Sequence, residues 1–212
     1  FSIDHKEAAF WSVHGPVIKG KHATYAIRYS WDNNIKTIEQ WYYMNKAKNF
    51  KEWNEAMSIM ALPMFNAGYA DKEGNIFYIY NAKLPIRKNN FNWNGVIPGN
   101  TSETLWKEFV KYEDLPQILN PPSGFIQNCN NTPYYTTKDK NNNPTPNFDE
   151  SIYSGIETKL TNRSLRAMQL FSDLSSVSYD DFKNIKFDLA YAKDSNMAHY
   201  VNKAKGLIKD SK

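Results

Sequence analysis

Three carboxamide side chains lie within four residues of one another, in the segment Asn128-Cys129-Asn130-Asn131. A carboxamide N–H can donate a hydrogen bond to the negative charge that develops on a carbonyl oxygen under nucleophilic attack. The apolar run over 124–131 predicts a short strand that ends in these polar residues, and the end of a strand is a rigid place to hold such a donor. An Asn that follows a strand also favours a simple turn, which is the alternative interpretation.

Arg163 lies at the predicted start of a helix over 162–174. The first turn of a helix is the positive end of its macrodipole, where Asp or Glu is more favourable than a cation. An acidic partner or an anionic substrate would explain a cation at this place. Exposure to solvent is the simpler alternative.

Other residue types that perform catalysis show no supporting pattern. The four histidines, His5, His14, His22 and His199, have no metal-ligand spacing such as HxH or HExxH, and no GxSxG, P-loop or GxGxxG motif is present. The single Cys129 excludes an internal disulfide. A lone cysteine in an apolar strand is typical of a small buried hydrophobe, with a nucleophile as the less common alternative. We therefore predict no metal and no cofactor.

The composition excludes several classes of protein. No window approaches the roughly 18 consecutive apolar residues of a membrane-spanning helix. Aromatic residues make up 15% of the chain, which is too much apolar surface for a disordered protein. The net charge of +4 comes from scattered lysines and four isolated arginines, so we predict no nucleic-acid partner.

Two hairpins are predicted in the first half of the chain. Alternating aromatic and aliphatic residues predict a strand over 23–31, which pairs through a turn at Gly20 with a strand over 10–18. Its apolar face would carry Tyr25, Ile27, Tyr29 and Trp31. A second hairpin over 64–82 turns at Asp71-Lys72-Glu73-Gly74. The segment 84–124 is predicted to be irregular.

Helical spacing predicts four helices. The predicted segments are 37–47 with Ile38 and Trp41 on its apolar stripe, 50–61 capped by Asn49 and Glu52 and ended by Pro63, 162–174 capped by Thr161 or Asn162, and one that follows Ser178 with Asp181 as its capping partner. Two hairpins, several helices and no alternating strand–helix rhythm predict an α+β fold with antiparallel sheets.

The order of eight segments resembles the penicillin acylase (penicillin amidase) family of N-terminal-nucleophile hydrolases. The segments are HGPVI, AIRYSW, MNKAKNFKEWNEA, YADKEGNIFY, LPIR, IPG, NPPSGFIQNCNN and NRSLRAMQLF, and together they cover nearly the whole chain. The resemblance implies an α+β fold that forms part of an αββα sandwich, with residues 1–212 as one segment of the acylase β chain. It also implies that the nucleophile, the α chain and the C-terminal part of the β chain lie outside this sequence.

The resemblance further implies an amidohydrolase that cleaves N-acylated amines, such as β-lactam side chains or acyl-homoserine lactones. The reaction would pass through an acyl-enzyme on an N-terminal Ser whose own α-amine serves as the base. The family's N-x-N-N segment assigns the oxyanion role to Asn130, and Arg163 matches an Arg that helps to orient the nucleophile's amine and the Asn. Cys129 stands where penicillin G acylases have Trp. No metal site is implied for this segment.

The same resemblance puts Trp41 and Phe65 in the acyl pocket, although packing on a helical stripe with Ile38 would also explain Trp41. The implied partners are a small-molecule N-acylated amine and the remaining α and β segments, without a membrane, and the implied location is periplasmic or secreted. The alternative function is a non-catalytic, degenerate acylase-like module that binds glycans or hydrophobic ligands through its aromatic surface.

Overall fold

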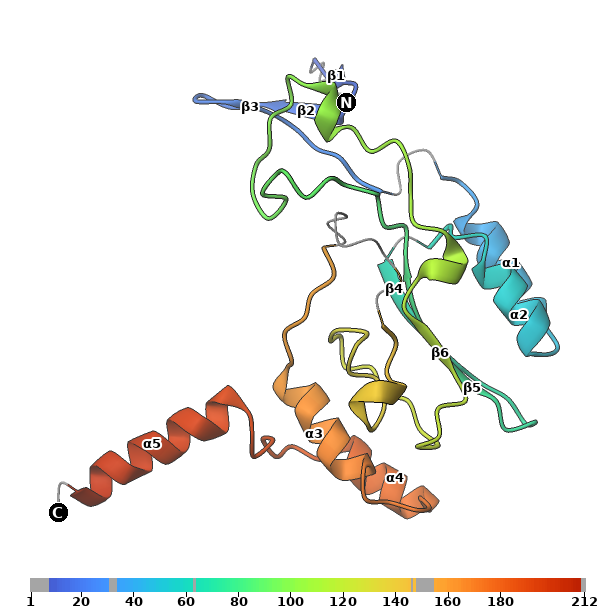
Figure 1. Cartoon of the computed structure of the whole chain (residues 1–212), viewed down its shortest axis with the longest axis vertical. Helices are drawn as coiled ribbons and strands as arrows, with labels where there is room; N and C mark the ends of the chain where they lie inside the picture. Colours follow the sequence, from blue (N-terminus) through green and yellow to red (C-terminus); the bar gives the residue numbers. More distant parts are fainter. Residues whose placement is uncertain (1–7, 31–33, 63, 146, 148–154, 211–212) are drawn as a thin grey trace, which may run out of the picture. The chain divides into compact units, whose positions relative to one another are not determined.

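The computed structural model of the chain describes residues 8–30, 34–62, 64–145, 147 and 155–210. The chain divides into two compact units, coloured along the sequence in Figure 1. Unit 1 comprises residues 1–64, 82–114 and 148–155, and unit 2 comprises residues 65–81, 115–147 and 156–212. The fold is α+β, as predicted, with antiparallel strands and five α-helices among the described residues. None of the helices in that part of the chain has the length and apolar character needed to span a membrane.

Unit 1 begins with a three-stranded antiparallel sheet of β1 (Phe10–Ser12), β2 (Gly15–Lys19) and β3 (Thr24–Ala26). The predicted hairpin is present between β2 and β3, and the Gly20 N–H closes its turn by donating to the Ala23 carbonyl at 2.9 Å. The register pairs Ile18 of β2 with Tyr25 of β3.

The strand predicted over 10–18 is two strands, because the chain reverses at Val13 and His14. Gly15 follows this turn with φ of 123°, and an added Cβ would lie only 2.2 Å from the Ile27 carbonyl oxygen. Only glycine avoids both the strained backbone and the contact, so Gly15 allows the two hairpins to share β2.

The apolar face predicted for β3 and the residues after it is not buried within the described part of the chain. Tyr25, Ile27 and Tyr29 each leave between 43% and 48% of their surface exposed. Trp31, the fourth predicted member of this face, lies outside the described residues.

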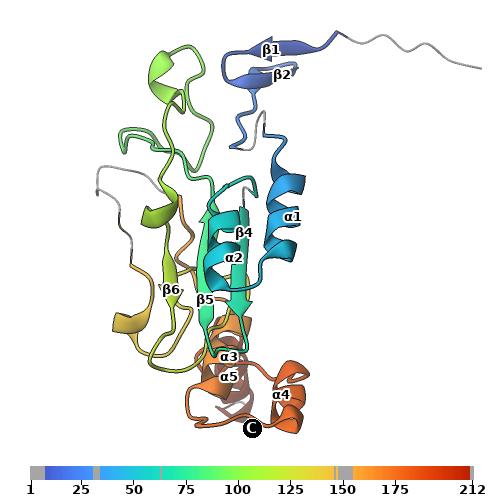
Figure 2. The ribbon, with the colours of Figure 1, turned by 90° about the vertical axis from the view of Figure 1, so that its right-hand side faces the viewer.

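Two helices follow, α1 (Thr37–Lys46) and α2 (Phe50–Met57), which lie side by side in Figure 2. The predicted N-cap of α2 is confirmed, because the Asn49 Oδ1 accepts from the Glu52 N–H at 3.0 Å. The reciprocal contact of a capping box is replaced by one a residue earlier: the Glu52 carboxylate accepts from the Lys48 N–H at 2.9 Å. The helix ends at Met57 rather than at residue 61, where it was expected to end. Pro63, the predicted terminator, lies outside the described residues.

The apolar stripe predicted for α1 is wrong. Ile38 is 82% exposed and Trp41 is 44% exposed, whereas Gln40 is fully buried. The Gln40 Oε1 accepts from the backbone N–H groups of Ala61 and Leu62 at 2.7 and 3.2 Å. Gln40 therefore satisfies buried backbone groups of the chain that leaves α2, and this is why a polar residue occupies the buried position.

The core beneath this helical pair comes mainly from α2 and the residues after it. Trp53 and Met57 are buried, as the spacing of α2 predicted. The other buried apolar residues here are Ala56, Ala61 and Leu62.

Unit 2 contains a three-stranded sheet with the order β4-β5-β6, visible in Figure 2. The predicted second hairpin is present as β4 (Met64–Ala70) and β5 (Ile76–Ala82), and Gly74 in its turn has φ of 88°. The strand β6 (Gln117–Leu119) pairs antiparallel with β5. It lies in the segment that was predicted to be irregular, because three residues are too few for a periodic signal.

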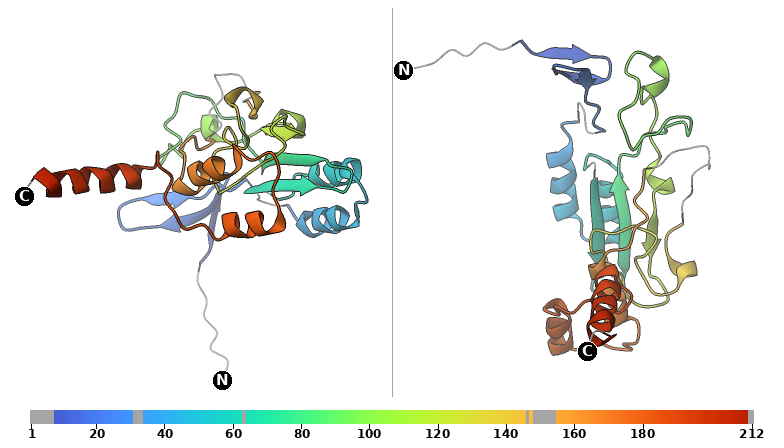
Figure 3. Two further views of the ribbon diagram at one scale, coloured as in Figure 1. Left: turned by 90° about the horizontal axis from the view of Figure 1, so that it is seen from below. Right: turned by 90° about the vertical axis from the view of Figure 1, so that its left-hand side faces the viewer.

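Helices α3 (Asn162–Phe171), α4 (Tyr179–Lys186) and α5 (Asn196–Asp210) complete unit 2, and Figure 3 shows them in orange and red. The helix starts predicted at Thr161 and Ser178 are confirmed, since both residues close capping boxes. No helix was predicted at the position of α5.

Candidate active site

The segment 124–131 is a loop, so the predicted strand is wrong. A strand requires a neighbouring strand that pairs along its length. Here the neighbouring segment is itself a loop: the Gln127 N–H donates to the Thr136 carbonyl at 2.7 Å, and the Thr137 hydroxyl donates to the Phe125 carbonyl at 2.7 Å. These contacts hold the loop in place without a ladder.

The three carboxamides of this loop have different tasks. Asn131 is buried, and its Nδ2 donates to the carbonyls of Thr132 and Tyr135 at 2.8 and 3.0 Å. Its Oδ1 accepts from the Cys129 N–H at 2.9 Å. Asn131 therefore stabilises the turn, as the alternative interpretation of this segment predicted. Both of its N–H donors are used, so it cannot donate to an oxyanion.

Asn128 is exposed and supports the residue that comes two positions later. Its Oδ1 accepts from the Asn130 N–H at 3.2 Å. Its side chain also hydrogen-bonds to Tyr78 of β5, whose pKa is raised by burial. The hydroxyl of Tyr78 donates to the Asn66 Oδ1 on the neighbouring strand β4 at 2.7 Å, so the Asn128–Tyr78 interaction links the loop to a residue that is held within the sheet.

Asn130 has the backbone conformation expected of a specialised residue. Its φ is 56°, in the left-handed region that few residues other than Gly, Asn and Asp adopt. Its side-chain Oδ1 accepts a hydrogen bond from the Arg163 Nη2 at 3.1 Å. A guanidinium group can only donate, so this contact identifies the amide oxygen and turns the Nδ2 away from Arg163. Among the described residues, the Nδ2 of Asn130 donates to no protein atom.

Arg163 is exposed on the first turn of α3, as the simpler alternative predicted, and its hydrogen-bond partner is a neutral amide rather than an acidic residue. The capping box of Thr161 with Ser164 satisfies the start of the helix, so Arg163 is free of that task. The structure thus brings together the two residues to which the resemblance assigned catalytic roles. Their roles in catalysis remain predictions.

Cys129 is half-buried beside this pair. Burial raises the pKa of its thiol, and the positive charge of Arg163 lowers the pKa only in part. The thiol is therefore protonated at neutral pH, whereas the thiolate is the nucleophilic form.

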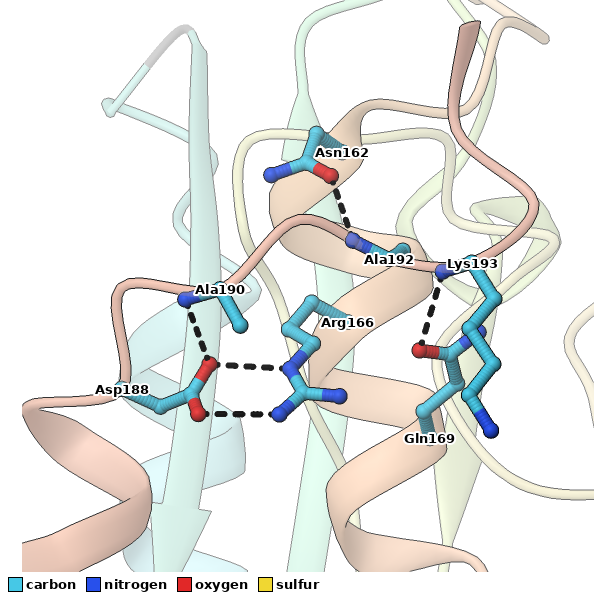
Figure 4. Close-up of polar contacts among 7 residues, drawn as sticks. All are labelled: Asn162, Arg166, Gln169, Asp188, Ala190, Ala192 and Lys193. Carbon is cyan, nitrogen blue, oxygen red and sulfur yellow. Dashed lines mark hydrogen bonds and ion pairs between the residues drawn. The ribbon is translucent and has the colours of Figure 1, made fainter. Parts of the chain in front are cut away.

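A short segment after α4 lies along α3. Residues 188–194, which we call the strap, contact three side chains of α3, namely Asn162, Arg166 and Gln169, and Figure 4 draws one contact or ion pair of each. Sequence reasoning missed this contact. The available signal was the spacing of Asn162, Arg166 and Gln169, which puts three polar side chains on one helical face.

The two residues predicted for the acyl pocket lie in different units. Trp41 is on α1 in unit 1, and Phe65 is on β4 in unit 2. They are 44% and 53% exposed, so neither is a core residue of the described chain. Packing with Ile38, the alternative for Trp41, is wrong because Ile38 is itself exposed. The pocket stays a prediction.

Across the described residues, no group of three or more His, Cys, Asp or Glu side chains is arranged to hold a metal ion.

Comparisons with known proteins agree on one family. A family model described as penicillin amidase matches residues 4–211. The penicillin G acylase of Escherichia coli is 34% identical over 126 residues, which are 58% of this chain and 15% of that protein. The penicillin acylase 2 proenzyme of Pseudomonas sp. (strain SE83) is 33% identical over 61 residues, which are 29% of this chain and 8% of that protein.

The fold is also similar to a solved structure. A thermostable penicillin G acylase from Alcaligenes faecalis superposes with a TM-score of 0.67 at 24% identity, over 87% of this chain and 31% of that chain. The matched regions are therefore less than a third of each of these relatives in length.

Proposed function

The chain belongs to the penicillin amidase family, and from this premise we propose that the protein of which it forms a segment hydrolyses the amide bond of N-acylated amines. The relatives named above are penicillin acylases, which supports an amidohydrolase. The single observation that carries the proposal for this segment is the contact between Arg163 and the Asn130 Oδ1, which leaves the Asn130 Nδ2 group available as a donor among the described residues.

The proposed chemistry needs a nucleophile from outside the described residues, an N-terminal Ser whose α-amine takes up the hydroxyl proton. The Ser oxygen attacks the amide carbon, and the carbonyl oxygen becomes negatively charged. The Nδ2 of Asn130 donates a hydrogen bond to that oxygen. Collapse of the intermediate releases the amine, which takes the proton from the ammonium group, and water then hydrolyses the acyl-enzyme.

Arg163 has a supporting role in this proposal. Its charge-assisted hydrogen bond to the Asn130 Oδ1 holds the amide in one orientation. It also draws electron density toward the amide oxygen, which strengthens the Nδ2 as a donor. The Asn128 and Asn131 side chains accept from the backbone N–H groups of Asn130 and Cys129, so the donor is preorganised before substrate binds.

The acyl group of the substrate would contact Trp41 and Phe65 in this proposal. Both side chains are large and apolar, and both are partly exposed in the described chain, which suits residues that cover a ligand. The remaining α and β segments of the acylase are the proposed protein partners. Relative rates on a panel of acylated substrates would identify the acyl group, whether that of a penicillin, of an acyl-homoserine lactone or of another amide.

The decisive experiment replaces Asn130 by Ala in the whole protein. Loss of one oxyanion donor lowers kcat by about 10²–10³-fold, with a much smaller effect on KM. The substrates are p-nitroanilides acylated with phenylacetyl, phenoxyacetyl or straight-chain fatty acids, and the variant is compared on the anilide that the wild type cleaves fastest. Asn202→Ala, an exposed Asn on α5, is the matched control. Wild-type turnover in Asn130→Ala would remove Asn130 from the reaction.

A non-catalytic binding module is the second candidate. The exposure of Trp11, Tyr179 and Tyr200, at 69%, 81% and 66%, favours it. The gene discriminates the two functions: a Ser, Thr or Cys behind an autocleavage-competent Gly upstream of Phe1 supports the enzyme, and the lack of such a residue supports the module.

We also propose, from the family resemblance, a periplasmic or secreted location. Cell fractionation followed by immunoblotting tests it, and recovery in the cytoplasmic fraction alone would contradict it.

A further inference from the structure

The strap is fastened to one face of α3 by three side chains. Asn162, Arg166 and Gln169 follow the spacing i, i+4, i+7, which brings them to the same side of the helix. Each of them contacts a residue of the strap, and Figure 4 shows these contacts.

The middle contact is a bidentate ion pair. The Arg166 Nε donates to the Asp188 Oδ1 at 2.8 Å, and the Arg166 Nη2 donates to the Asp188 Oδ2 at 2.9 Å. Only 25% and 22% of the two side chains are exposed. The Asp188 Oδ1 also accepts from the Ala190 N–H at 3.1 Å. Two parallel hydrogen bonds fix both distance and orientation, which a single lysine contact could not do.

The two outer contacts hold the backbone of the strap. The Asn162 Oδ1 accepts from the Ala192 N–H at 2.8 Å, and the Gln169 Oε1 accepts from the Lys193 N–H at 3.4 Å. Ala192 is fully buried, so its N–H needs a protein partner. Asn162 supplies that partner from the first turn of α3.

The loop of Asn130 meets α3 at both ends of the helix. At the C-terminal end, the rings of Phe125 and Phe171 stack with their centroids 5.8 Å apart. At the N-terminal end, Arg163 reaches Asn130. Asn162, which holds the strap, is the neighbour of Arg163. A shift or rotation of α3 would therefore change the distance from the Arg163 guanidinium to the Asn130 amide.

We propose that Asn162, Arg166 and Asp188 are positioning residues that fasten the strap to α3 and thereby place Arg163 at Asn130. This inference rests on the proposed oxyanion role of Asn130. In this proposal the three residues act on the reaction only through Arg163 and Asn130. The bidentate geometry of the Arg166–Asp188 pair, which fixes both distance and orientation, is the property that the inference uses.

A double-mutant cycle in the whole protein tests this inference. Asp188→Asn keeps the shape of the side chain and removes its charge, and it is combined with Asn130→Ala. We expect Asp188→Asn alone to lower kcat by about tenfold with KM changed by less than about twofold. In the Asn130→Ala background, the same change should lower kcat by less than about twofold, because the residue it positions is gone.

Two results would overturn the inference while leaving the proposed function intact. One is an equal loss of kcat from Asp188→Asn in both backgrounds, since a merely structural residue acts independently of Asn130. The other is wild-type kcat in Asp188→Asn. Wild-type kcat in Asn130→Ala would contradict the proposed function and the inference together. Failure of the inference alone is seen in Asp188→Asn, and failure of the proposed function is seen in Asn130→Ala.

Matched variants guard against loss of folding. Asp173→Asn removes a carboxylate that is 93% exposed in the same unit and outside the strap, and it should leave kcat unchanged. If Asp188→Asn yields no folded protein, Asn162→Ala takes its place in the cycle, because Thr161 still caps α3 in that variant. The same coupling with Asn130→Ala supports the inference, and additive losses refute it.

Discussion

The Arg163 guanidinium and the Asn130 amide oxygen are 3.1 Å apart, although the two residues are separated by 33 positions in the chain. One residue begins a helix, and the other lies in a loop with φ of 56°. The contact holds the Asn130 Oδ1 toward Arg163 and directs the Nδ2 away from it. The Asn130 amide is therefore an oriented hydrogen-bond donor.

Removal of the Arg163 charge should weaken catalysis without abolishing it. We expect Arg163→Ala to lower kcat of the whole protein by about 10- to 100-fold, because the Asn130 amide loses its orientation. Arg163→Lys should recover part of that loss, since lysine keeps the charge but has no planar fork. Steady-state kinetics on the p-nitroanilide panel provide the measurement. Lys159→Ala, an exposed cation in the same unit, serves as the control and should behave as wild type.

The thiol of Cys129 should report on Arg163. Burial raises the thiol pKa and the Arg163 charge lowers it, so Arg163→Ala should raise the pKa further. At a fixed pH near 8, the variant should then have less thiolate and react more slowly with iodoacetamide. Mass spectrometry of the alkylated peptide over a pH series follows the rate. A faster reaction in the variant would show that the charge of Arg163 does not act on this thiol.

On α1, replacing the buried polar residue Gln40 by an apolar one should destabilise the protein more than replacing the exposed apolar residue Ile38 by a polar one. Gln40→Leu should lower the free energy of unfolding by about 2–3 kcal/mol, because buried N–H groups of Ala61 and Leu62 lose their acceptor. Ile38→Ser, an apolar-to-polar change on the same helix, should alter stability little because Ile38 is 82% exposed. Thermal unfolding of the whole protein compares the two variants. The opposite ranking would contradict the packing of α1.

The glycine that separates the first two hairpins should not tolerate a side chain. Gly15→Ala puts a Cβ 2.2 Å from the Ile27 carbonyl oxygen at φ of 123°, and it should destabilise the protein by about 1–3 kcal/mol. Gly99→Ala is the matched control, since a Cβ there meets no atom within 4 Å. The two thermal midpoints provide the comparison, and equal values would argue against the close approach at Gly15.

The ion pair of the strap should depend on pH in one direction. The hydrogen bonds from Arg166 hold the pKa of Asp188 below its usual value of 3.8. Because the pKa is lower in the folded state, the pair stabilises the protein at pH values above 3.8, and this stabilisation is lost as the pH falls through the folded-state pKa. The difference in thermal midpoint between wild type and Asp188→Asn should thus be full at pH 7 and shrink below pH 4. A difference that grows on acidification would have the wrong sign.

Local patterns predicted the elements whose signals are local. The turns of both predicted hairpins lie at Gly20 and Gly74, and Gly74 has the positive φ that favours glycine. The starts of α2, α3 and α4 follow from capping residues that bond within one turn of the same helix. The order of short segments also identified the penicillin amidase family, which the comparison over residues 4–211 confirmed.

Burial and long-range pairing were decided by the tertiary structure. Period alone could not show that Gln40 rather than Ile38 is buried on α1, because the decision depends on backbone donors 21 and 22 residues away. The segment before Asn130 has strand-like composition, but it is a loop because it has no strand to pair with along its length.

The candidate site shows the same division. The residue types at Asn130 and Arg163 are local facts, and the family resemblance pointed to both positions. Their contact, the free donor on the Asn130 amide and the strap along α3 exist only after distant segments have packed. A hydrogen bond needs its two partners at one distance and angle, and that geometry is set by the fold as a whole rather than by the neighbours of either residue.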